Sequence, residues 1–316
     1  FTHHVIVAEK STHKLYLFKN NQSYPQFMGE HQMATGKKAG NKIFQGDHRT
    51  PEGIYFLTDF IPHQKLIERH GKRGEIYGVG AFVLNYPNPI DRKVGKTGSG
   101  IWLHSTNDET RIEKGLDSRG CIVTANQNLI EVSKYIELNK TMIVVVHNLE
   151  WLKKDAWMGK REKLLKTFSS WKNAWEDENI NQYLDQYHKE KFQDPHRGNY
   201  SSFKEYKKAV FSQPGKPTVE TSHLSIMGTD NYSVVNFIQD YTSPTLEDIG
   251  RKTLYLQQDS FYNWKIVSEN WSKRGIDKGL EKEEKGRVAF KPSLRFFKTT
   301  RPDQILENPI SKKENN

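Results

Sequence analysis

The chain has 316 residues, with 48 Lys and Arg against 38 Asp and Glu, which gives a formal net charge of +10. At about 100–200 residues per domain, this length predicts two domains and is ample for a buried core. The mean hydropathy is −0.81. No run approaches the ~18–20 consecutive apolar residues of a membrane-spanning helix, so the sequence as given excludes an integral membrane protein.

The positive charge is spread along the chain. Residues 1–150 carry 19 basic and 15 acidic side chains, and residues 151–316 carry 29 and 23. An even excess is typical of a solvated surface, whereas nucleic-acid binding usually shows a concentrated basic stripe or a recognisable module. Nucleic acid is therefore not predicted as a partner.

Cys121 is the single cysteine of the chain. It excludes an internal disulfide and any zinc or iron–sulfur site built from several cysteines. His63 and His70 lack a set of companion ligands with zinc spacing. We therefore expect no metal.

The first half of the chain is predicted to be mostly β. Short apolar or alternating runs, separated by Gly, Pro and Asn, indicate strands. They cover residues 4–8, 14–18, 53–59, 81–85, 101–104 and 142–146. A helical stripe predicts one helix over residues 129–138.

The composition changes after residue 150. Residues 151–192 hold no Pro, and their apolar residues recur every three or four positions, which predicts amphipathic helices whose aromatic side chains form a core. Four strand-like runs follow, at residues 219–227, 232–240, 251–257 and 261–267. Helices followed by a strand meander predict an α+β domain with an antiparallel sheet.

Two neighbouring stretches carry the chemistry that the sequence suggests. His104 closes a short apolar strand, and Gly120 directly precedes Cys121. An imidazole can take a thiol proton, and a glycine lets backbone N–H groups approach a developing oxyanion. A lone cysteine is also often a small buried apolar residue, so spacing by itself leaves both interpretations open.

Four ordered motif blocks resemble the YkuD-type L,D-transpeptidase domain over residues 1–148. They are Thr-Pro-Glu-Gly-Ile-Tyr at 50–55, Leu-Asn-Tyr-Pro-Asn at 84–88, Thr-Gly-Ser-Gly-Ile-Trp-Leu-His at 97–104 and Ser-Arg-Gly-Cys-Ile at 118–122. The resemblance implies a sandwich-like, mostly-β fold. It also implies an enzyme that forms a thioester with a peptidoglycan tetrapeptide stem, without a metal or organic cofactor.

By this resemblance Cys121 is the nucleophile and His104 is the base and later the acid. The Ser105 carbonyl would orient the imidazole, and the backbone of Gly120 and Cys121 would supply oxyanion donors. Further residues of the motif blocks are expected to line the substrate groove, although packing is an equal alternative for the aromatic ones. These candidates are Ser118, Arg119, Tyr86 and Trp102.

The chain departs from the family pattern at two places. Arg119 stands where the family usually has a second histidine, and Val123-Thr124 replaces a common Arg or Asn. A fixed cation beside the thiol would lower the thiol pKa or bind a substrate carboxylate. A surface arginine without such a role is the alternative.

Residues 158–271 resemble a nuclear-transport-factor-2-like domain, a cone with a curved antiparallel sheet and an apolar pocket. The expected organisation is a catalytic domain at 1–150, a helical linker at 151–157, this second domain at 158–272 and a charged extension at 273–316. A homodimer through the second domain is left open.

The pairing of these two domains is similar to cell-shape-determining murein L,D-carboxypeptidases. We therefore expect a hydrolase that removes the terminal D-Ala from tetrapeptide stems in the periplasm, with its export signal outside this chain. An L,D-transpeptidase is the first alternative, since the two reactions diverge only when water or an amine attacks the thioester. An inactive module that binds peptidoglycan or a protein partner is the second.

Overall fold

The computed structural model describes residues 2–20, 24–274, 276 and 290–307. Contacts divide the chain into two compact units. The N-terminal unit holds His3–Asn21, Pro25–Glu150 and Arg287–Asn316, and the C-terminal unit holds Trp151–Gly286 with Phe1–Thr2 and Gln22–Tyr24. Each unit is described by itself below.

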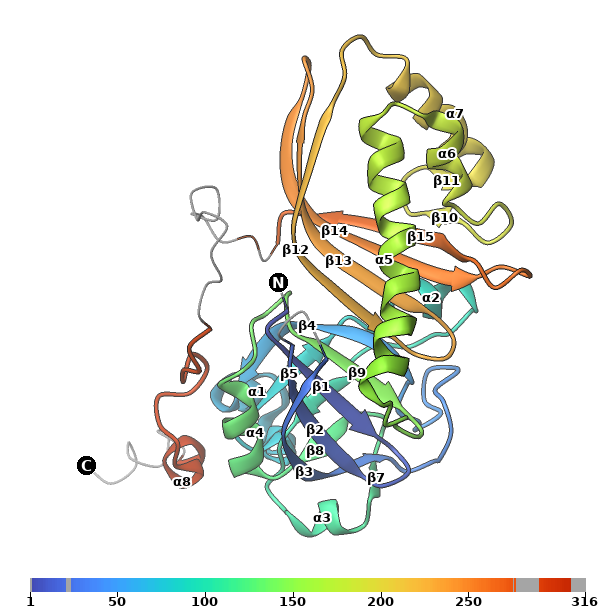
Figure 1. Ribbon diagram of the computed structural model, residues 1–316. Coiled ribbons are helices and arrows are strands. Elements are labelled where there is room, and N and C mark those ends of the chain that lie inside the picture. The colour runs from blue at the N-terminus through green and yellow to red at the C-terminus, as the bar shows by residue number, and fades with distance from the viewer. Residues whose placement is uncertain (1, 21–23, 275, 277–289, 308–316) are drawn as a thin grey trace. The chain divides into compact units, whose positions relative to one another are not determined.

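Among the described residues, nine strands form the sheet of the N-terminal unit (Figure 1). They are β1 His4–Glu9, β2 Lys14–Lys19, β3 Gln26–Gly36, β4 Gly53–Pro62, β5 Gly80–Leu84, β6 Trp102–His104, β7 Leu116–Ser118, β8 Ile122–Thr124 and β9 Met142–Val146. The strand order is β2-β1-β9-β4-β5-β6-β8-β3, and β3 pairs back onto β2. Eight strands thus close into a ring. Strand β7 pairs with the last two residues of β3, Thr35 and Gly36.

The closed sheet corrects the predicted sandwich-like fold. Strand β3 closes the ring, because its residues 26–32 pair with β2 while Met33 and Ala34 pair with β8. The sequence analysis missed β3. Its first half is largely exposed and only its last four residues are buried, so it lacks the clean alternation that identifies a strand.

Short helices surround this sheet. They are α1 His63–His70, the 3₁₀ helix η1 Gly71–Tyr77, α2 Pro89–Lys93, α3 Thr110–Glu113, α4 Asn126–Ser133 and α8 Pro302–Leu306. The predicted helix at 129–138 corresponds to α4, which begins and ends earlier. The start of α2 is well determined, because the Asn88 side chain accepts from backbone N–H groups and Pro89 occupies the first turn.

Two phenylalanines of the described stretch 290–307 contribute to the core of the N-terminal unit. The Phe297 ring lies 5.2 Å from that of Phe60, and the Phe296 ring lies 4.9 Å from that of Phe82. Phe297 is buried within the same apolar cluster as the strands and α4. Part of the stretch predicted as a charged extension therefore packs as core.

The C-terminal unit combines helices with an antiparallel meander (Figure 1). Its helices are α5 Lys154–Glu176, α6 Ile180–Asp185 and α7 Tyr200–Phe211, and its strands are β10 Gln193–Asp194, β11 Gly198–Asn199, β12 Thr218–Gly228, β13 Ser233–Thr242, β14 Glu247–Gln258 and β15 Trp264–Ser272. The order β12-β13-β14-β15 confirms the predicted meander. The structure adds α7, which the sequence analysis did not predict, and α5 begins inside the predicted linker.

The sheet of the C-terminal unit is strongly curved (Figure 1). Its pairing slips between Ser222 and Ser225 and again between Tyr255 and Leu256. Such bulges bend a strand and increase its twist. The aromatic side chains of α5 and α6 fill the concave face, as the helical spacing predicted. None of the helices described in either unit is long and apolar enough to cross a membrane.

Candidate active site

The register of two short strands places the predicted nucleophile and base on one face of the sheet. Strands β6 and β8 run parallel, with Leu103 opposite Ile122 and His104 opposite Val123. Leu103 and Ile122 are fully buried in the core. Side chains alternate along a strand, so Cys121, two residues before Val123, shares the opposite face with His104.

A backbone carbonyl orients the His104 imidazole. Its Nδ1 lies 2.5 Å from the Ser105 carbonyl oxygen, which can only accept, so Nδ1 carries the proton and donates it. The neutral ring therefore has an unprotonated Nε2. Burial lowers the His104 pKa to about 4, against the opposing effect of the Ser105 hydrogen bond. The Tyr77 ring meets the imidazole edge-on, with centroids 4.9 Å apart.

The thiol is held by the loop before β6. The Cys121 Sγ lies 3.6 Å from the Gly100 carbonyl oxygen, and the residue as a whole is half-buried. Burial of the sulfur raises the Cys121 pKa to about 11, although a hydrogen bond from the Trp102 backbone N–H and the charges of Arg111 and Lys42 lower it. With the imidazole pKa near 4, the resting pair is an uncharged thiol and an uncharged imidazole.

Ser118 organises the turn that carries the cysteine. Its hydroxyl donates to the Cys121 carbonyl at 2.6 Å and accepts from the Gly120 N–H at 3.0 Å. Gly120 has φ 125, and a Cβ there would lie 2.8 Å from the Arg49 carbonyl oxygen, so only glycine fits. The structure thus places Ser118 inside the turn rather than in a groove, and it commits the Gly120 N–H to Ser118.

The two aromatic candidates differ in position. Tyr86 is 5% exposed, and its hydroxyl donates to the Thr97 carbonyl at 3.1 Å, so it packs in the core and holds the 97–100 loop. Trp102 is half-buried, and its ring lies 5.0 Å from that of Tyr77. Trp102 therefore remains beside the candidate site, whereas Tyr86 does not line it.

Arg119 is exposed. Its charge acts on the Tyr77 phenol rather than on the Cys121 thiol. Burial and the nearby Cys121 raise the pKa of the Tyr77 phenol, and Arg119 opposes this shift together with Arg111. The cations that lower the Cys121 pKa are Arg111 and Lys42. Of the two predicted roles for Arg119, contact with a substrate carboxylate fits this position better than tuning of the thiol.

Sequence reasoning missed three residues that surround the pair, namely Tyr77, Arg111 and Lys42. Each comes from an element outside the motif blocks and reaches the site only through the fold. No local pattern around them distinguishes them from ordinary surface residues. Among the described residues, no three His, Cys, Asp or Glu side chains come together as metal ligands.

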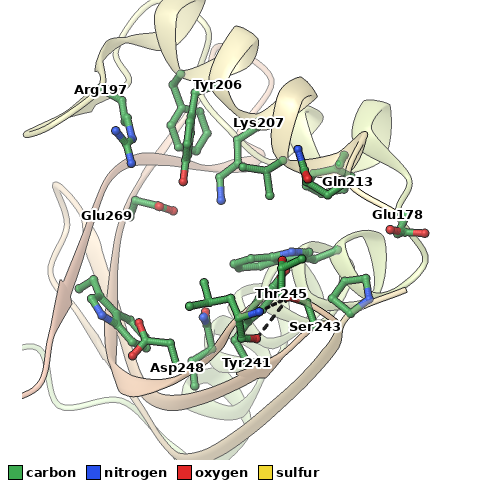
Figure 2. A pocket seen from close by; sticks show the side chains of 18 of the residues that line it. Glu178, Arg197, Tyr206, Lys207, Gln213, Tyr241, Ser243, Thr245, Asp248 and Glu269 are labelled. Carbon is green, nitrogen blue, oxygen red and sulfur yellow. Dashed lines mark hydrogen bonds between the residues drawn. The ribbon is translucent and has the colours of Figure 1, made fainter. Parts of the chain in front are cut away.

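The C-terminal unit contains a cavity of about 550 Å³ between α7 and the curved sheet (Figure 2). The Lys207 ammonium enters it over the Trp175 ring, 4.4 Å from the centroid. Burial lowers the Lys207 pKa to about 8. Glu269 accepts from Lys252 at 2.7 Å and from the Tyr187 hydroxyl at 2.8 Å. Burial acts to raise its pKa, but these partners and the Lys207 charge hold it below the ordinary value.

Both units match known domain families. Residues 3–146 match the YkuD family, the L,D-transpeptidase catalytic domain. Residues 163–270 match the family of the Cds6 C-terminal NTF2-like domain. No curated protein matches the chain.

Solved structures with both domains are similar over most of the chain. Bd1075 from Bdellovibrio bacteriovorus is 32% identical, with a TM-score of 0.74, and the match covers 88% of this chain and 94% of that one. The helical cell shape determining protein Pgp2 from Campylobacter jejuni is 26% identical, with a TM-score of 0.66, covering 84% of this chain and 91% of that one. The chain belongs to the YkuD L,D-transpeptidase family, whose members act on peptidoglycan, in the form that carries a C-terminal NTF2-like domain.

Proposed function

We propose that the protein is a murein L,D-carboxypeptidase that removes the terminal D-Ala from peptidoglycan tetrapeptide stems. The observation that carries the proposal is the parallel register of β6 and β8, which puts Cys121 and a carbonyl-oriented His104 on one face. A thiol on the same face as an imidazole with an unprotonated Nε2 supports nucleophilic acyl transfer.

The first half-reaction forms a thioester. His104 Nε2 accepts the thiol proton while the Cys121 sulfur attacks the carbonyl carbon that joins the L-centre of diaminopimelate to D-Ala. The carbonyl oxygen becomes an oxyanion. Because the Gly120 N–H is bonded to Ser118, the Cys121 N–H is the proposed donor to that oxyanion. The C–N bond then breaks, and the imidazolium returns its proton to the departing D-Ala amine.

The second half-reaction regenerates the thiol. His104 takes a proton from water as the water oxygen attacks the thioester carbonyl, the C–S bond breaks, and the proton passes to the sulfur. The products are a tripeptide stem and the free enzyme. An amine from a second stem would give a cross-link by the same route, which is the transpeptidase alternative.

Arg119 is the proposed contact for a carboxylate of the stem. It is exposed two residues before the nucleophile, and its guanidinium can form two parallel hydrogen bonds to a carboxylate. Trp102 is half-buried on the same face and is the proposed apolar wall. Ser118 has an internal role and is not proposed as a substrate contact.

The proposed location is the periplasm, where peptidoglycan lies in Gram-negative bacteria. Pgp2 is described as a helical cell shape determining protein and shares both domains with this chain. We infer that trimming of stems by this protein likewise influences cell shape.

A time course with purified monomeric and dimeric muropeptides tests the activity. The expected result is conversion of tetrapeptide to tripeptide with release of D-Ala, abolished by Cys121→Ala and retained by His147→Ala, which changes an exposed histidine directly after β9. New cross-linked dimers would instead establish transpeptidation. Binding of muropeptides without any conversion would establish the binding module and overturn the enzyme proposal.

A further inference from the structure

Arg111, in the short helix α3, joins three separate segments of the N-terminal unit. Its Nε donates to the Asp117 carboxylate on β7 at 2.5 Å. Its Nη1 donates at 3.2 Å to the Ile76 carbonyl in η1 and to the Thr106 hydroxyl at 3.2 Å. The ion pair with Asp117 is mostly buried, with side chains 17% and 15% exposed. An arginine that holds three segments in this way is a structural clamp rather than a solvated cation.

Two of the Arg111 contacts, Ile76 and Thr106, are adjacent in sequence to residues that hold the His104 imidazole. Ile76 precedes Tyr77, whose ring packs edge-on against His104. Thr106 follows Ser105, whose carbonyl accepts the imidazole N–H. Moving either backbone segment would therefore rotate or shift the base.

The third contact lies one residue from the turn that carries the nucleophile. Asp117 precedes Ser118, whose hydroxyl bonds both Gly120 and Cys121. The Arg111 side chain thus connects the supports of the base to the support of the thiol. Because one side chain contacts the supports of both residues, it limits the motion of the imidazole relative to the thiol.

The charge of Arg111 reaches both partners. It lowers the pKa of Cys121 and also that of His104, whereas Asp117 raises the pKa of His104. The other charged or titratable groups that act on the thiol are Lys42 and the Tyr77 phenol. Loss of the Arg111 charge would therefore shift both titrations upward.

We propose that Arg111 is a positioning residue of the active site, which sets the geometry of Cys121 and His104 through Ser118, Ser105 and Tyr77. The inference rests on the proposed function for its meaning in catalysis. The geometry that carries it does not depend on whether water or an amine completes the reaction.

Three variants separate geometry from charge. Arg111→Met keeps an unbranched side chain of about the length of the arginine aliphatic stem and removes both the charge and the hydrogen bonds. Arg111→Lys keeps the charge and loses the fork. Lys114→Met is the matched control, because Lys114 also lies 4.0 Å from Asp117 but its side chain is 59% exposed. Two readouts are used, the pH dependence of iodoacetamide alkylation of Cys121 and the pH profile of kcat and KM for D-Ala release.

For Arg111→Met, we expect alkylation at pH 9 to slow about tenfold, equivalent to one pKa unit. We expect kcat to fall about 100-fold with KM changed by less than about twofold, the pattern of a misplaced catalytic pair. Arg111→Lys should alkylate like the unaltered protein and still lose about tenfold in kcat, because a lysine cannot hold three acceptors in a plane. Lys114→Met should behave like the unaltered protein in both assays.

The proposal is overturned if folded Arg111→Met alkylates and turns over normally, or if Lys114→Met causes the same changes. If Arg111→Met does not fold, Arg111→Lys decides, since unchanged kcat there removes the geometric role. If the unaltered protein releases no D-Ala, the proposed function fails. The alkylation arm then still confirms or refutes the effect of Arg111 on the thiol.

Discussion

The candidate active site of the N-terminal unit and the cavity of the C-terminal unit bury their ionisable groups in opposite ways. In the N-terminal unit, burial raises the pKa of Cys121 to about 11 and lowers that of His104 to about 4, so both partners are uncharged at rest. In the C-terminal unit, Glu269 stays ionised although it is buried, because Lys252 and Tyr187 donate to it at 2.7 and 2.8 Å. A counter-charge within hydrogen-bonding distance decides whether a buried group keeps its charge.

This difference has a chemical consequence. An uncharged thiol and imidazole have to move a proton during attack, so the reactive ion pair forms only when substrate is present. The ionised cluster of the C-terminal unit, formed by Glu269, Lys252 and Lys207, already carries its charges beside the cavity and needs no proton transfer. The charge of the candidate active site and the charge of the C-terminal cavity are therefore expected to change at different pH values.

The largest expected effect is on catalysis. His104→Ala removes the base, and we expect kcat for D-Ala release to fall about 10³-fold, within the range for loss of general acid–base catalysis. The fold should remain, because the neighbouring Ser105 and Thr106 are held by other contacts. His147→Ala serves as the control in the same muropeptide assay. A loss below tenfold would mean that His104 is not the base.

The next effect concerns the ionised cluster. Glu269→Gln keeps the shape of the side chain but removes the carboxylate that pairs with Lys252 and one of the two negative charges that act on Lys207, and we expect it to destabilise the C-terminal unit by about 3 kcal/mol. Urea unfolding followed by tryptophan fluorescence measures this, because six of the seven tryptophans belong to the C-terminal unit. Glu205→Gln, at an exposed ion pair with Lys208, should cost less than about 0.5 kcal/mol. Equal effects of the two variants would show that burial does not matter here.

The pH profile tests the uncharged pair directly. His104 acts as a base only when it is unprotonated, so kcat/KM for D-Ala release should rise through a pKa of about 4 and stay level through neutral pH. Alkylation of Cys121 without substrate should be slow at pH 7, because its pKa of about 11 leaves almost no thiolate. Rapid alkylation at pH 7 would instead indicate a preformed ion pair.

The smallest effect concerns a second buried histidine. His4 is 4% exposed and packs against Tyr135 and Phe290, and burial lowers its pKa to about 4. An unfolded histidine binds a proton near pH 6.5, so its contribution to stability is present above that pH and is lost as the pH falls toward 4. Relative to its effect at pH 8, His4→Phe should raise the free energy of unfolding by about 2 kcal/mol at pH 5. Urea unfolding at both pH values measures the difference, and a constant difference would contradict the prediction.

The sequence by itself determined the division into a β-rich half and an α+β half, and it identified the stretches that carry Cys121 and His104. Both results depend on short-range information. The meander of the second half reads as four separate strand-like runs, and His104 and Cys121 sit in compact motif blocks. Local patterns of this kind survive without knowledge of the fold.

Only the tertiary structure decided how the sheet closes, which residues support the site and where Phe296 and Phe297 pack. Strand β3 closes the ring through pairings on both sides that its mixed polarity conceals. Arg111 and Tyr77 matter because segments far apart in the chain meet around His104, and Phe297 joins a core formed more than 150 residues earlier. Such contacts depend on the path of the whole chain through space, so no local periodicity or motif records them.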